Sequence, residues 1–413
     1  MSTPAMPDTL YLWYLGAPEA PVLVGELNLV MNRRAVSLRY ADTWRKNGFA
    51  LSEDLPLGDQ EFFPKDKDVA AGAVDDARPD RWGERVIRLL DRPPRLSLLE
   101  YLYYAGDDRF GALGVSSSAQ TYLPREIGPL PKVGDVEMIA EIVRRVLAKE
   151  PIDEHHKRLI APGVTMGGAR PKALLQLDGE EWVLKFAEAD RPAEPLIEHA
   201  SLTLAAKAGI TVVETRPIPF VRGVALAIKR FDRSEGRRWH ALSANVALKA
   251  AGVELSYPNL AQLLRRRGDV DTHRAQMHEL FRRLVFNILI DNTDDHEKNH
   301  VLLVSQAQQY ALAPAFDVLP MGQSLGYQAM AVGTQGAESS IENALSAAGQ
   351  YWLTPQAAKA EVNRVVEVVN AWREHFLAAG VPAASVEELA QHIDRPFLLR
   401  QRLGQYQASD FSV

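Results

Sequence analysis

The chain has 413 residues, of which 46% are hydrophobic and 24% are charged, so it is long enough for two or three subdomains and has the composition of a globular enzyme. Its formal net charge of −6 argues against a protein whose main role is to coat nucleic acid. Because the sequence contains no cysteine, disulfides, thiolate metal sites and cysteine nucleophiles are excluded.

The sequence shows no sign of export or membrane insertion. The first residues lack a basic segment followed by a long apolar stretch, which a secretory signal would need. No run approaches the roughly 18 apolar residues of a membrane span. We therefore expect a soluble, cytoplasmic protein with no membrane partner.

The first third of the chain is expected to be rich in β-strands. Short apolar or alternating runs, separated by Gly, Pro and Asn, occur at residues 11–15, 22–30 and 35–40. Helical patterns follow at 81–90 and 96–104. The next segment, 123–131, is dense in proline and glycine and predicts a boundary between subdomains.

The middle of the chain predicts strands with one helix between them. Asp135 can cap a helix whose apolar residues recur at helical spacing as far as Leu147. Asp178-Gly179 lies between two apolar runs and predicts a β-hairpin with a tight turn. A helix over 196–208 should stop at Gly209, and residues 224–231 are strand-like.

The last part, from about residue 240, is expected to be mainly helical. Residues 278–290 place their apolar side chains on one helical face. Thr354 and Pro355 predict the start of a long helix, as N-cap and first helical residue, and Gly380 predicts its end. The order of these elements predicts an α+β enzyme.

The stretch 292–300, Asn-Thr-Asp-Asp-His-Glu-Lys-Asn-His, carries the clearest chemical signal. Within it, Asp294 and Asn299 are five positions apart. Phosphoryl transfer needs a carboxylate that orients the attacking hydroxyl and accepts its proton, together with a nearby oxygen ligand for Mg²⁺. Asp317 follows eighteen residues after Asn299 and fits a second Mg²⁺ ligand, because hard cations take oxygen donors.

Residues upstream supply groups that bind a nucleotide. Lys185 ends a predicted strand, from which its ammonium can reach phosphates, and Glu198 on the next helix can hold that lysine by an ion pair. Before the hairpin, two adjacent glycines can turn their backbone N–H groups toward phosphate, beside two basic residues that add positive charge: Gly167, Gly168, Arg170 and Lys172.

Each of these signals alone has a more ordinary explanation. An Asp-Asp-His cluster is often a polar loop, and a lysine at a strand end is usually solvated. A glutamate early in a helix, such as Glu198, is favourable because of the helix dipole. The roles nevertheless follow one another in the order that a kinase requires, which predicts an ATP- and Mg²⁺-dependent phosphotransferase.

Three stretches resemble signatures of the HipA family, the serine/threonine kinase toxins of bacterial toxin–antitoxin modules. They are Gly-Gly-Ala-Arg-Pro-Lys at 167–172, the whole 292–300 stretch, and Phe316-Asp317. Residues 294–299, Asp-Asp-His-Glu-Lys-Asn, are also similar to the D-R-H-x-x-N loop of phosphatidylinositol-kinase-like enzymes. The resemblance covers nearly the whole chain, although Arg-Pro-Asp-Arg-Trp at 78–82 replaces the more usual Leu-Pro-x-Gly-Trp.

The resemblance implies a HipA-like bilobal fold of the α+β class, related to protein kinases and phosphatidylinositol kinases. Residues 1–122 would form a small β-rich N-terminal subdomain. Residues 132–235 would form the ATP-binding lobe, and residues 236–413 a mainly helical C-terminal lobe that carries the catalytic loop.

The resemblance also assigns roles to single residues. It implies that Asp294 is the catalytic base, that Asn299 and Asp317 are Mg²⁺ ligands, that Lys185 contacts the ATP phosphates, and that His296 lies beside the nucleotide.

Two further segments match functional parts of the family. Residues 228–232 match the connection that contacts adenine, so the backbone near Phe231 would meet the base and Asp232 would meet the ribose hydroxyls. Lys229 stands where some relatives carry Glu. Thr165 falls where the family has an autophosphorylated serine, which implies self-inactivation by ejection of that loop.

The family implies a biological role as well. The protein would phosphorylate a Ser or Thr of a translation component such as an aminoacyl-tRNA synthetase. Its partner would be a HipB-like helix-turn-helix antitoxin, and it would meet DNA only through that antitoxin.

Three other functions stay open at this point. A metal-dependent hydrolase could use Asp294, Asp295, His296 and His300, but zinc sites rarely contain Asn, and the glycines and Lys185 would then have no role. The chain could instead be a non-catalytic regulator with the kinase fold. It could also be a kinase of small molecules or lipids, because similar loops serve those substrates.

Overall fold

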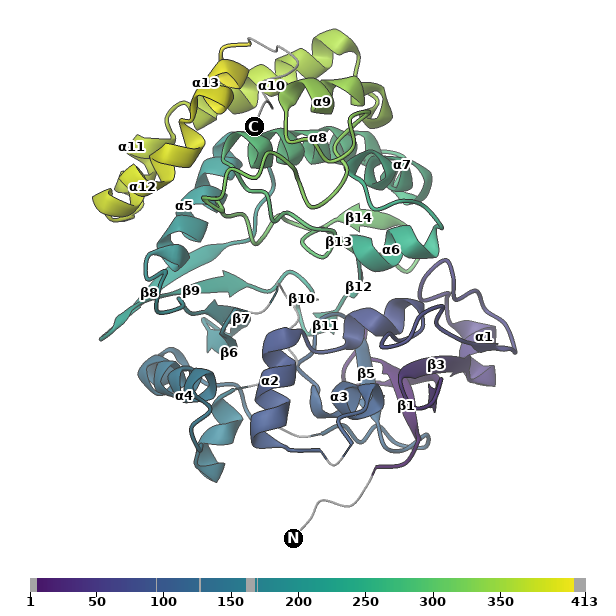
Figure 1. Cartoon of the computed structure of the whole chain (residues 1–413). Helices are drawn as coiled ribbons and strands as arrows, with labels where there is room; N and C mark the ends of the chain where they lie inside the picture. Colours follow the sequence, from purple (N-terminus) through teal and green to yellow (C-terminus); the bar gives the residue numbers. More distant parts are fainter. Residues whose placement is uncertain (1–5, 94, 126–127, 161–167, 169, 405–413) are drawn as a thin grey trace. The chain divides into compact units, whose positions relative to one another are not determined.

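The computed structural model describes residues 6–404 except 94, 126–127, 161–167 and 169. Its elements, labelled in Figure 1, fall into two compact units. The first unit consists of Met1–Asp190, Thr215–Ala251 and Leu302–Gln308, and the second of Arg191–Glu214, Gly252–Val301 and Gln309–Val413. This division differs from the three predicted subdomains, because α5 (Glu194–Lys207) belongs to the second unit and residues 236–251 to the first.

The N-terminal part of the first unit is a five-stranded antiparallel sheet in the order β4-β3-β2-β1-β5. The three predicted strands are confirmed within two residues. The strands are β1 (Thr9–Tyr14), β2 (Val22–Val30), β3 (Ala35–Tyr40), β4 (Glu61–Phe62) and β5 (Leu113–Ser116). Leu10 and Leu12 alternate along β1 and are buried, so one face of the sheet packs on the core. The short helices α1 (Asp42–Asn47) and η1 (Gly72–Ala77) follow β3 and β4.

The predicted helices of the first unit are also present, with identifiable caps. The Asp80 carboxylate accepts the Gly83 N–H at 2.8 Å and starts α2 (Arg81–Leu90). Ser97 and Glu100 form a capping box at the start of α3 (Leu98–Tyr104). Asp135 is the N-cap of α4 (Val136–Ala148), but its carboxylate accepts the Lys132 N–H at 2.8 Å and makes no cap bond to the helix.

The second sheet of this unit is antiparallel in the order β6-β7-β9-β8. The strands are β6 (Lys172–Leu177), β7 (Glu180–Lys185), β8 (Thr215–Phe220) and β9 (Gly223–Lys229). Asp178 and Gly179 both adopt positive φ, as a tight hairpin turn between β6 and β7 requires. β8 was not predicted, because Pro217 and Pro219 disfavour a strand; they are tolerated at the edge of the sheet.

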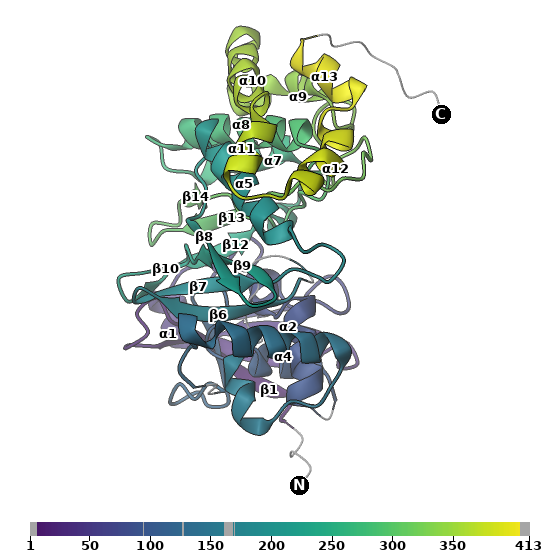
Figure 2. The ribbon, with the colours of Figure 1, turned by 90° about the vertical axis from the view of Figure 1, so that its left-hand side faces the viewer.

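Two helices cover one face of this second sheet. Figure 2 shows α4 running across β6, with α2 beside it. Trp82 of α2 and Ile139 and Val143 of α4 pack with Trp182 and Leu184 of β7 in one buried cluster. The remaining elements of the unit are η2 (Val133–Asp135), η3 (Glu154–Leu159), β10 (Arg233–Ser234), β11 (Arg237–Arg238), β12 (His240–Ser243) and α6 (Ala244–Ala250), with β12 beside β13 (Val301–Val304).

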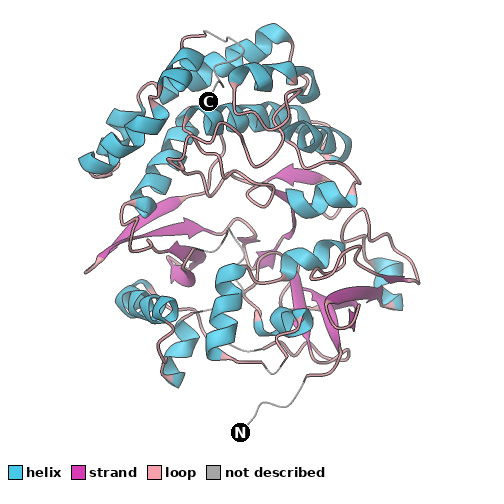
Figure 3. Cartoon of the chain, in the orientation of Figure 1, coloured by secondary structure: helices cyan, strands magenta, loops and turns pink. Residues whose placement is uncertain are grey.

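The second unit is mainly helical, as predicted (Figure 3). Its centre is α8 (His273–Leu289), whose apolar residues are buried and which packs against α7 (Tyr257–Arg267) and α10 (Pro355–Val369). The other elements are α5, β14 (Tyr310–Leu312), α9 (Ile341–Ser346), η4 (Ala348–Tyr351), α11 (Trp372–Ala378), α12 (Ala383–Ile393) and α13 (Pro396–Arg402).

The prediction of one long helix from Pro355 to Gly380 was wrong, because the chain breaks into α10 and α11 at Asn370 and Ala371. The break lets Trp372 bury its ring, and its indole N–H donates to the Asp394 carboxylate at 3.0 Å. Buried indole N–H groups need such an acceptor, so tertiary contacts prevail over helical continuity here.

In the part of the chain that the structure describes, no helix combines the length and the apolar character that a membrane crossing demands.

Candidate active site

The 292–300 loop leaves α8 through a turn that is held by ion pairing. Asp291 adopts φ of +58°, a conformation that side-chain-bearing residues rarely take. One of its carboxylate oxygens pairs with the Arg395 guanidinium, and the other accepts the Ser324 N–H at 3.0 Å. The start of the loop is therefore fixed to two later segments of the second unit.

Within this loop, neighbouring acidic residues have opposite environments. Asp294 is exposed, whereas Asp295 is only 2% exposed. Oδ2 of Asp295 accepts hydrogen bonds from the Tyr257 hydroxyl, from Asn287 Nδ2 at 2.7 Å and from His300 Nε2 at 2.9 Å. The buried Asp295 thus anchors the loop, and the Asp294 carboxylate is exposed to solvent.

The electrostatics of Asp295 agree with this role. Burial alone would raise its pKa, but the His300 ring and the Tyr257 hydroxyl outweigh burial and hold the pKa of the carboxyl below its usual value. The same burial and the neighbouring carboxylate raise the pKa of Tyr257 well above its ordinary value. Tyr257 therefore stays a neutral donor to an ionised Asp295.

Asn299 presents an oxygen that has no partner among the described residues. Its Nδ2 donates to the Asp294 carbonyl at 3.3 Å, and its Oδ1 is buried without a hydrogen bond. A buried amide oxygen normally has a partner, and amide and carboxylate oxygens are the ligands that Mg²⁺ prefers. The Asn299 side chain therefore fits a Mg²⁺ ligand.

The second predicted metal ligand lies in a segment that borders the same loop. Phe316 and Val318, on either side of Asp317, line a small pocket together with Asp295 and Asn299. Asp317 itself is partly exposed and adopts φ of +57°. Strained backbone of this kind often occurs at functional sites. The structure thus brings the Asp317 segment and the 292–300 loop together within one unit.

His296 lies in the same loop and is half-buried. Its backbone N–H donates to the Asp294 carbonyl at 2.9 Å, and its Nδ1 has no described partner. The predicted contact of His296 with the nucleotide stays a prediction.

The predicted phosphate-binding residues belong to the first unit. Thr165 and Gly167 lie outside the described residues. Gly168 adopts φ of +50°, which glycine takes without strain. Lys172 is 0% exposed, and its ammonium pairs with the Asp80 carboxylate and donates to the Gly168 carbonyl at 2.9 Å. Lys172 therefore ties the glycine segment to the start of α2, a contact that the sequence did not suggest.

Lys185 and Glu198 are both buried. Lys185 ends β7, and strand alternation places it on the sheet face opposite to Leu184, which packs on α2 and α4. Glu198 is in the second turn of α5 in the second unit. Their predicted ion pair stays a prediction.

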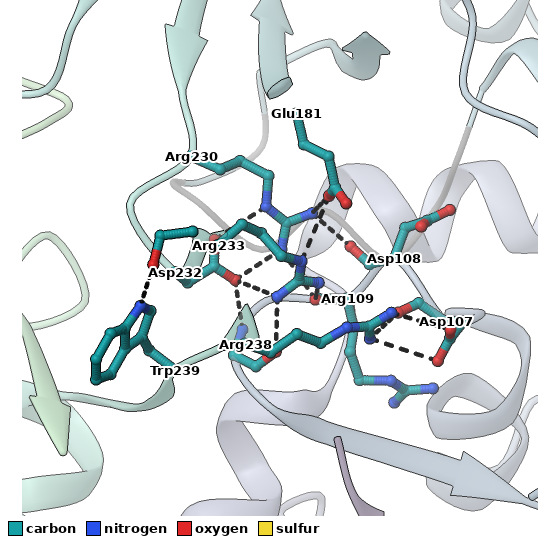
Figure 4. Close-up of polar contacts among 11 residues, drawn as sticks. Asp107, Asp108, Arg109, Glu181, Arg230, Asp232, Arg233, Arg238 and Trp239 are labelled. Atoms are coloured by element: carbon teal, nitrogen blue, oxygen red, sulfur yellow. Dashed lines mark hydrogen bonds and ion pairs between the residues drawn. The ribbon is translucent and has the colours of Figure 1, made fainter. Parts of the chain in front are cut away.

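The predicted adenine connection follows β9. The Phe231 ring packs edge-on against Phe110, with ring centroids 5.6 Å apart. Asp232 is buried, and its carboxylate accepts from the Arg230 and Arg233 guanidinium groups and from the Gly111 N–H (Figure 4). These contacts use the oxygens that were predicted to meet the ribose hydroxyls, and the ribose contact stays a prediction.

Sequence reasoning missed the residues that support the site. Tyr257 and Arg395 are far from the loop in sequence, and only the fold brings them to Asp295 and Asp291. Asn287 lies near the end of the preceding helix and reaches Asp295 from there. One signal was available: Asn287 is a polar residue within the apolar run that ends α8, where a buried amide needs a polar partner.

Comparison with known proteins now identifies the family. The family described as HipA-like C-terminal domain matches residues 164–372, and the HipA N-terminal domain family matches residues 21–116. This chain belongs to the HipA family. The resemblance noted from the sequence motifs is thereby confirmed.

A solved structure supports the fold of this HipA-family chain. A chain of the Shewanella oneidensis MR-1 toxin–antitoxin complex of HipA, HipB and operator DNA matches with a TM-score of 0.66 and 17% identity, over 97% of this chain and 100% of that chain. At this identity the match shows the fold, and the predicted HipA-like fold with a β-rich N-terminal region and a helical C-terminal part is confirmed.

Two curated relatives match over shorter stretches. "Putative kinase Y4dM" of Sinorhizobium fredii is 32% identical over 154 residues, which are 34% of this chain and 37% of the relative. A "Putative kinase" of Haemophilus influenzae is 24% identical over 180 residues, 38% of this chain and 52% of the relative. The matched stretches thus span about a third to a half of these relatives.

Proposed function

We propose that this HipA-family chain is an ATP- and Mg²⁺-dependent kinase that phosphorylates a Ser or Thr hydroxyl of a protein. The observation that carries the proposal is the geometry of the 292–300 loop. Asp295 is held inside by three donors, which leaves Asp294 exposed, and Asn299 offers an unpartnered buried oxygen five residues later. The names of the two curated relatives agree with a kinase.

In the proposed reaction, the Asp294 carboxylate orients the attacking hydroxyl and accepts its proton. The hydroxyl oxygen forms a bond to the γ-phosphorus while the bond from that phosphorus to the β,γ-bridging oxygen breaks, and ADP leaves. Asn299 and Asp317 would hold Mg²⁺, which neutralises charge on the phosphate oxygens. Lys185 and the N–H groups near Gly168 would bind the phosphates, with Glu198 orienting Lys185 and His296 beside the nucleotide.

We also propose that the chain is the toxin of a toxin–antitoxin module in the cytoplasm. The solved complex that shares its fold contains HipB and operator DNA. By this analogy its partner is a HipB-like helix-turn-helix antitoxin, and contact with DNA occurs through that partner. The proposed target is a translation component such as an aminoacyl-tRNA synthetase, and Thr165 is a candidate site of autophosphorylation.

The test compares Asp294→Asn with Lys298→Gln, a change at an exposed position of the same loop. Transfer of the γ-phosphate from labelled ATP to lysate proteins is measured together with ATP binding by calorimetry. Asp294→Asn should reduce transfer at least 100-fold, because general-base catalysis contributes about 10²–10⁴-fold, and should still bind ATP. Lys298→Gln should keep both properties.

Three outcomes would contradict the proposal. Undiminished transfer in Asp294→Asn would exclude the assigned base. Label found only in lipids or small molecules would indicate a different kinase class. ATP binding without transfer to any acceptor would indicate a non-catalytic regulator.

A further inference from the structure

A buried cluster of charges surrounds the connection that follows β9. Arg230 is 3% exposed and Asp232 is 0% exposed. The Arg230 guanidinium donates to both carboxylate oxygens of Asp232, from Nε at 2.9 Å and from Nη2 at 2.7 Å. Nη1 of Arg233 donates to Oδ2 of the same carboxylate at 2.9 Å. Such a two-pronged Arg–carboxylate pair fixes direction as well as distance.

The same arginines also donate hydrogen bonds to a loop that lies more than a hundred residues earlier in the sequence. This 107–111 loop lies between α3 and β5, in the N-terminal part of the first unit. Arg230 donates to the carbonyls of Asp108 at 2.8 Å and Arg109 at 3.0 Å. Arg233 donates to the carbonyls of Arg109 at 2.7 Å and Gly111 at 2.9 Å.

The loop in turn donates a hydrogen bond to the connection. The Gly111 N–H donates to Oδ2 of Asp232 at 2.7 Å. Figure 4 shows the two guanidinium groups between the Asp232 carboxylate and the 107–111 loop. The Phe110 ring, in the same loop, packs on Phe231 of the connection. Polar and apolar contacts therefore join the connection to this loop along 230–233.

The charges within the cluster depend on one another. Glu181 of β7 lies 3.4 Å from both Arg230 and Arg233. Burial alone would raise the pKa of Asp232, but the two arginines lower it to about 2. Burial and the neighbouring Arg230 lower the pKa of Arg233 to about 10. Removing one charged member leaves the remaining buried charges only partly compensated, which destabilises the arrangement of the others.

We propose that Arg230 and Asp232 are positioning residues for the base of the bound nucleotide. They hold the backbone around Phe231 against the 107–111 loop, so the N-terminal part of the chain helps to shape the adenine site. The role proposed for the Asp232 carboxylate is therefore to hold the connection in place through Arg230, Arg233 and the Gly111 N–H. The inference rests on the proposed function, because that function assigns 228–232 to adenine.

The test uses Arg230→Met, the milder Arg230→Lys, and two ligands. MgATP carries the base, whereas magnesium tripolyphosphate carries only the phosphates. Arg230→Met should raise the Kd for MgATP at least tenfold and leave the Kd for tripolyphosphate and the kcat at saturating ATP within about twofold. Arg230→Lys, which keeps the charge and loses the forked geometry, should raise the Kd for MgATP by an intermediate factor.

Asp91→Asn is the matched control. It removes the ion pair between Asp91 and Arg125, a less deeply buried Arg–Asp pair of the first unit. It should lower the Tm without changing the Kd for MgATP. If Arg230→Met does not fold, Arg230→Lys decides the question against the same control.

The failures of the two proposals can be told apart. If the wild-type protein binds no MgATP, the proposed function and this inference both fail. If the wild-type protein binds MgATP and the Arg230 variants bind it no more weakly than Asp91→Asn does, only the inference is overturned. Equal loss of affinity for MgATP and tripolyphosphate would also overturn it, because the effect would then not concern the base.

Discussion

Substitution of Asp295 should destabilise the second unit strongly, whereas substitution of its exposed neighbour Asp294 should leave the stability unchanged. Asp295→Ala leaves the Tyr257 hydroxyl, the Asn287 amide and the His300 ring N–H without their acceptor in a buried site. Each of the three buried donors left without a partner costs about 1–3 kcal/mol. Because these costs overlap, we expect a loss of about 3–5 kcal/mol.

For a unit of this size, 1 kcal/mol corresponds to roughly 2–4 °C in Tm, so Asp295→Ala should lower the Tm by about 6–20 °C. Asp295→Asn keeps the shape and one acceptor oxygen, and should lose less, about 1–3 kcal/mol. Thermal unfolding is followed by circular dichroism and by tryptophan fluorescence.

Two comparisons decide whether this reasoning holds. Asp294→Asn, at the adjacent exposed position, should leave the Tm unchanged while reducing phosphate transfer at least 100-fold. In a Tyr257→Phe background, Asp295→Ala should cost less than in the wild type, because one of the orphaned donors is already absent. If Asp295→Ala lowers the Tm no more than Asp294→Asn does, Asp295 is not the anchor of the loop.

Two further predictions concern the first unit. His240 is 1% exposed and its Nε2–H donates to the Leu51 carbonyl at 2.8 Å, and burial lowers its pKa from 6.5 to about 4. The contribution of His240 to the free energy of unfolding is therefore complete above pH 6.5. It falls by about 1.4 kcal/mol per pH unit as the pH drops to about 4, because in that range only the unfolded chain binds the proton. His240→Gln should flatten the plot of Tm against pH between pH 4 and 6.5. If the plots of the wild type and the variant run parallel there, His240 is not the source of this pH dependence. Asp80→Asn removes the carboxylate charge that pairs with the buried Lys172 ammonium and should cost about 3–5 kcal/mol. Adding Lys172→Met should recover most of the lost Tm, and no recovery in the double variant would show that the two residues do not act as a pair.

The sequence was informative wherever a local pattern determines local structure. α2, β2 and β3 coincide with the predicted ranges, because apolar periodicity and strong boundary residues agree there. The hairpin at Asp178-Gly179 was predictable because both positions need positive φ. β8 and the break between α10 and α11 were not predictable, since they depend on an edge position in a sheet and on the burial of Trp372.

For the candidate site, the sequence identified the residues proposed to act in the reaction better than the residues that hold them in place. Asp294, Asn299 and Asp317 stand out because a particular chemistry requires those residue types at that spacing. Tyr257, which supports Asp295, and Gly111, which supports Asp232, come from distant segments, and spacing carries no information about such contacts. The opposite exposure of Asp294 and Asp295 likewise depends on α7 and α8, which supply Tyr257 and Asn287.

The way in which the chain alternates between its two units bears on its biosynthesis. The first unit includes Leu302–Gln308, which bring β13 beside β12, and these residues follow the 292–300 loop in the chain. On the ribosome, the first unit must therefore wait for the roughly 50 residues that follow Ala251, which take about 3–10 s at ~5–20 residues per second. The first unit is thus completed only after the catalytic loop has been made, so a nascent chain with a finished first unit already contains the 292–300 loop.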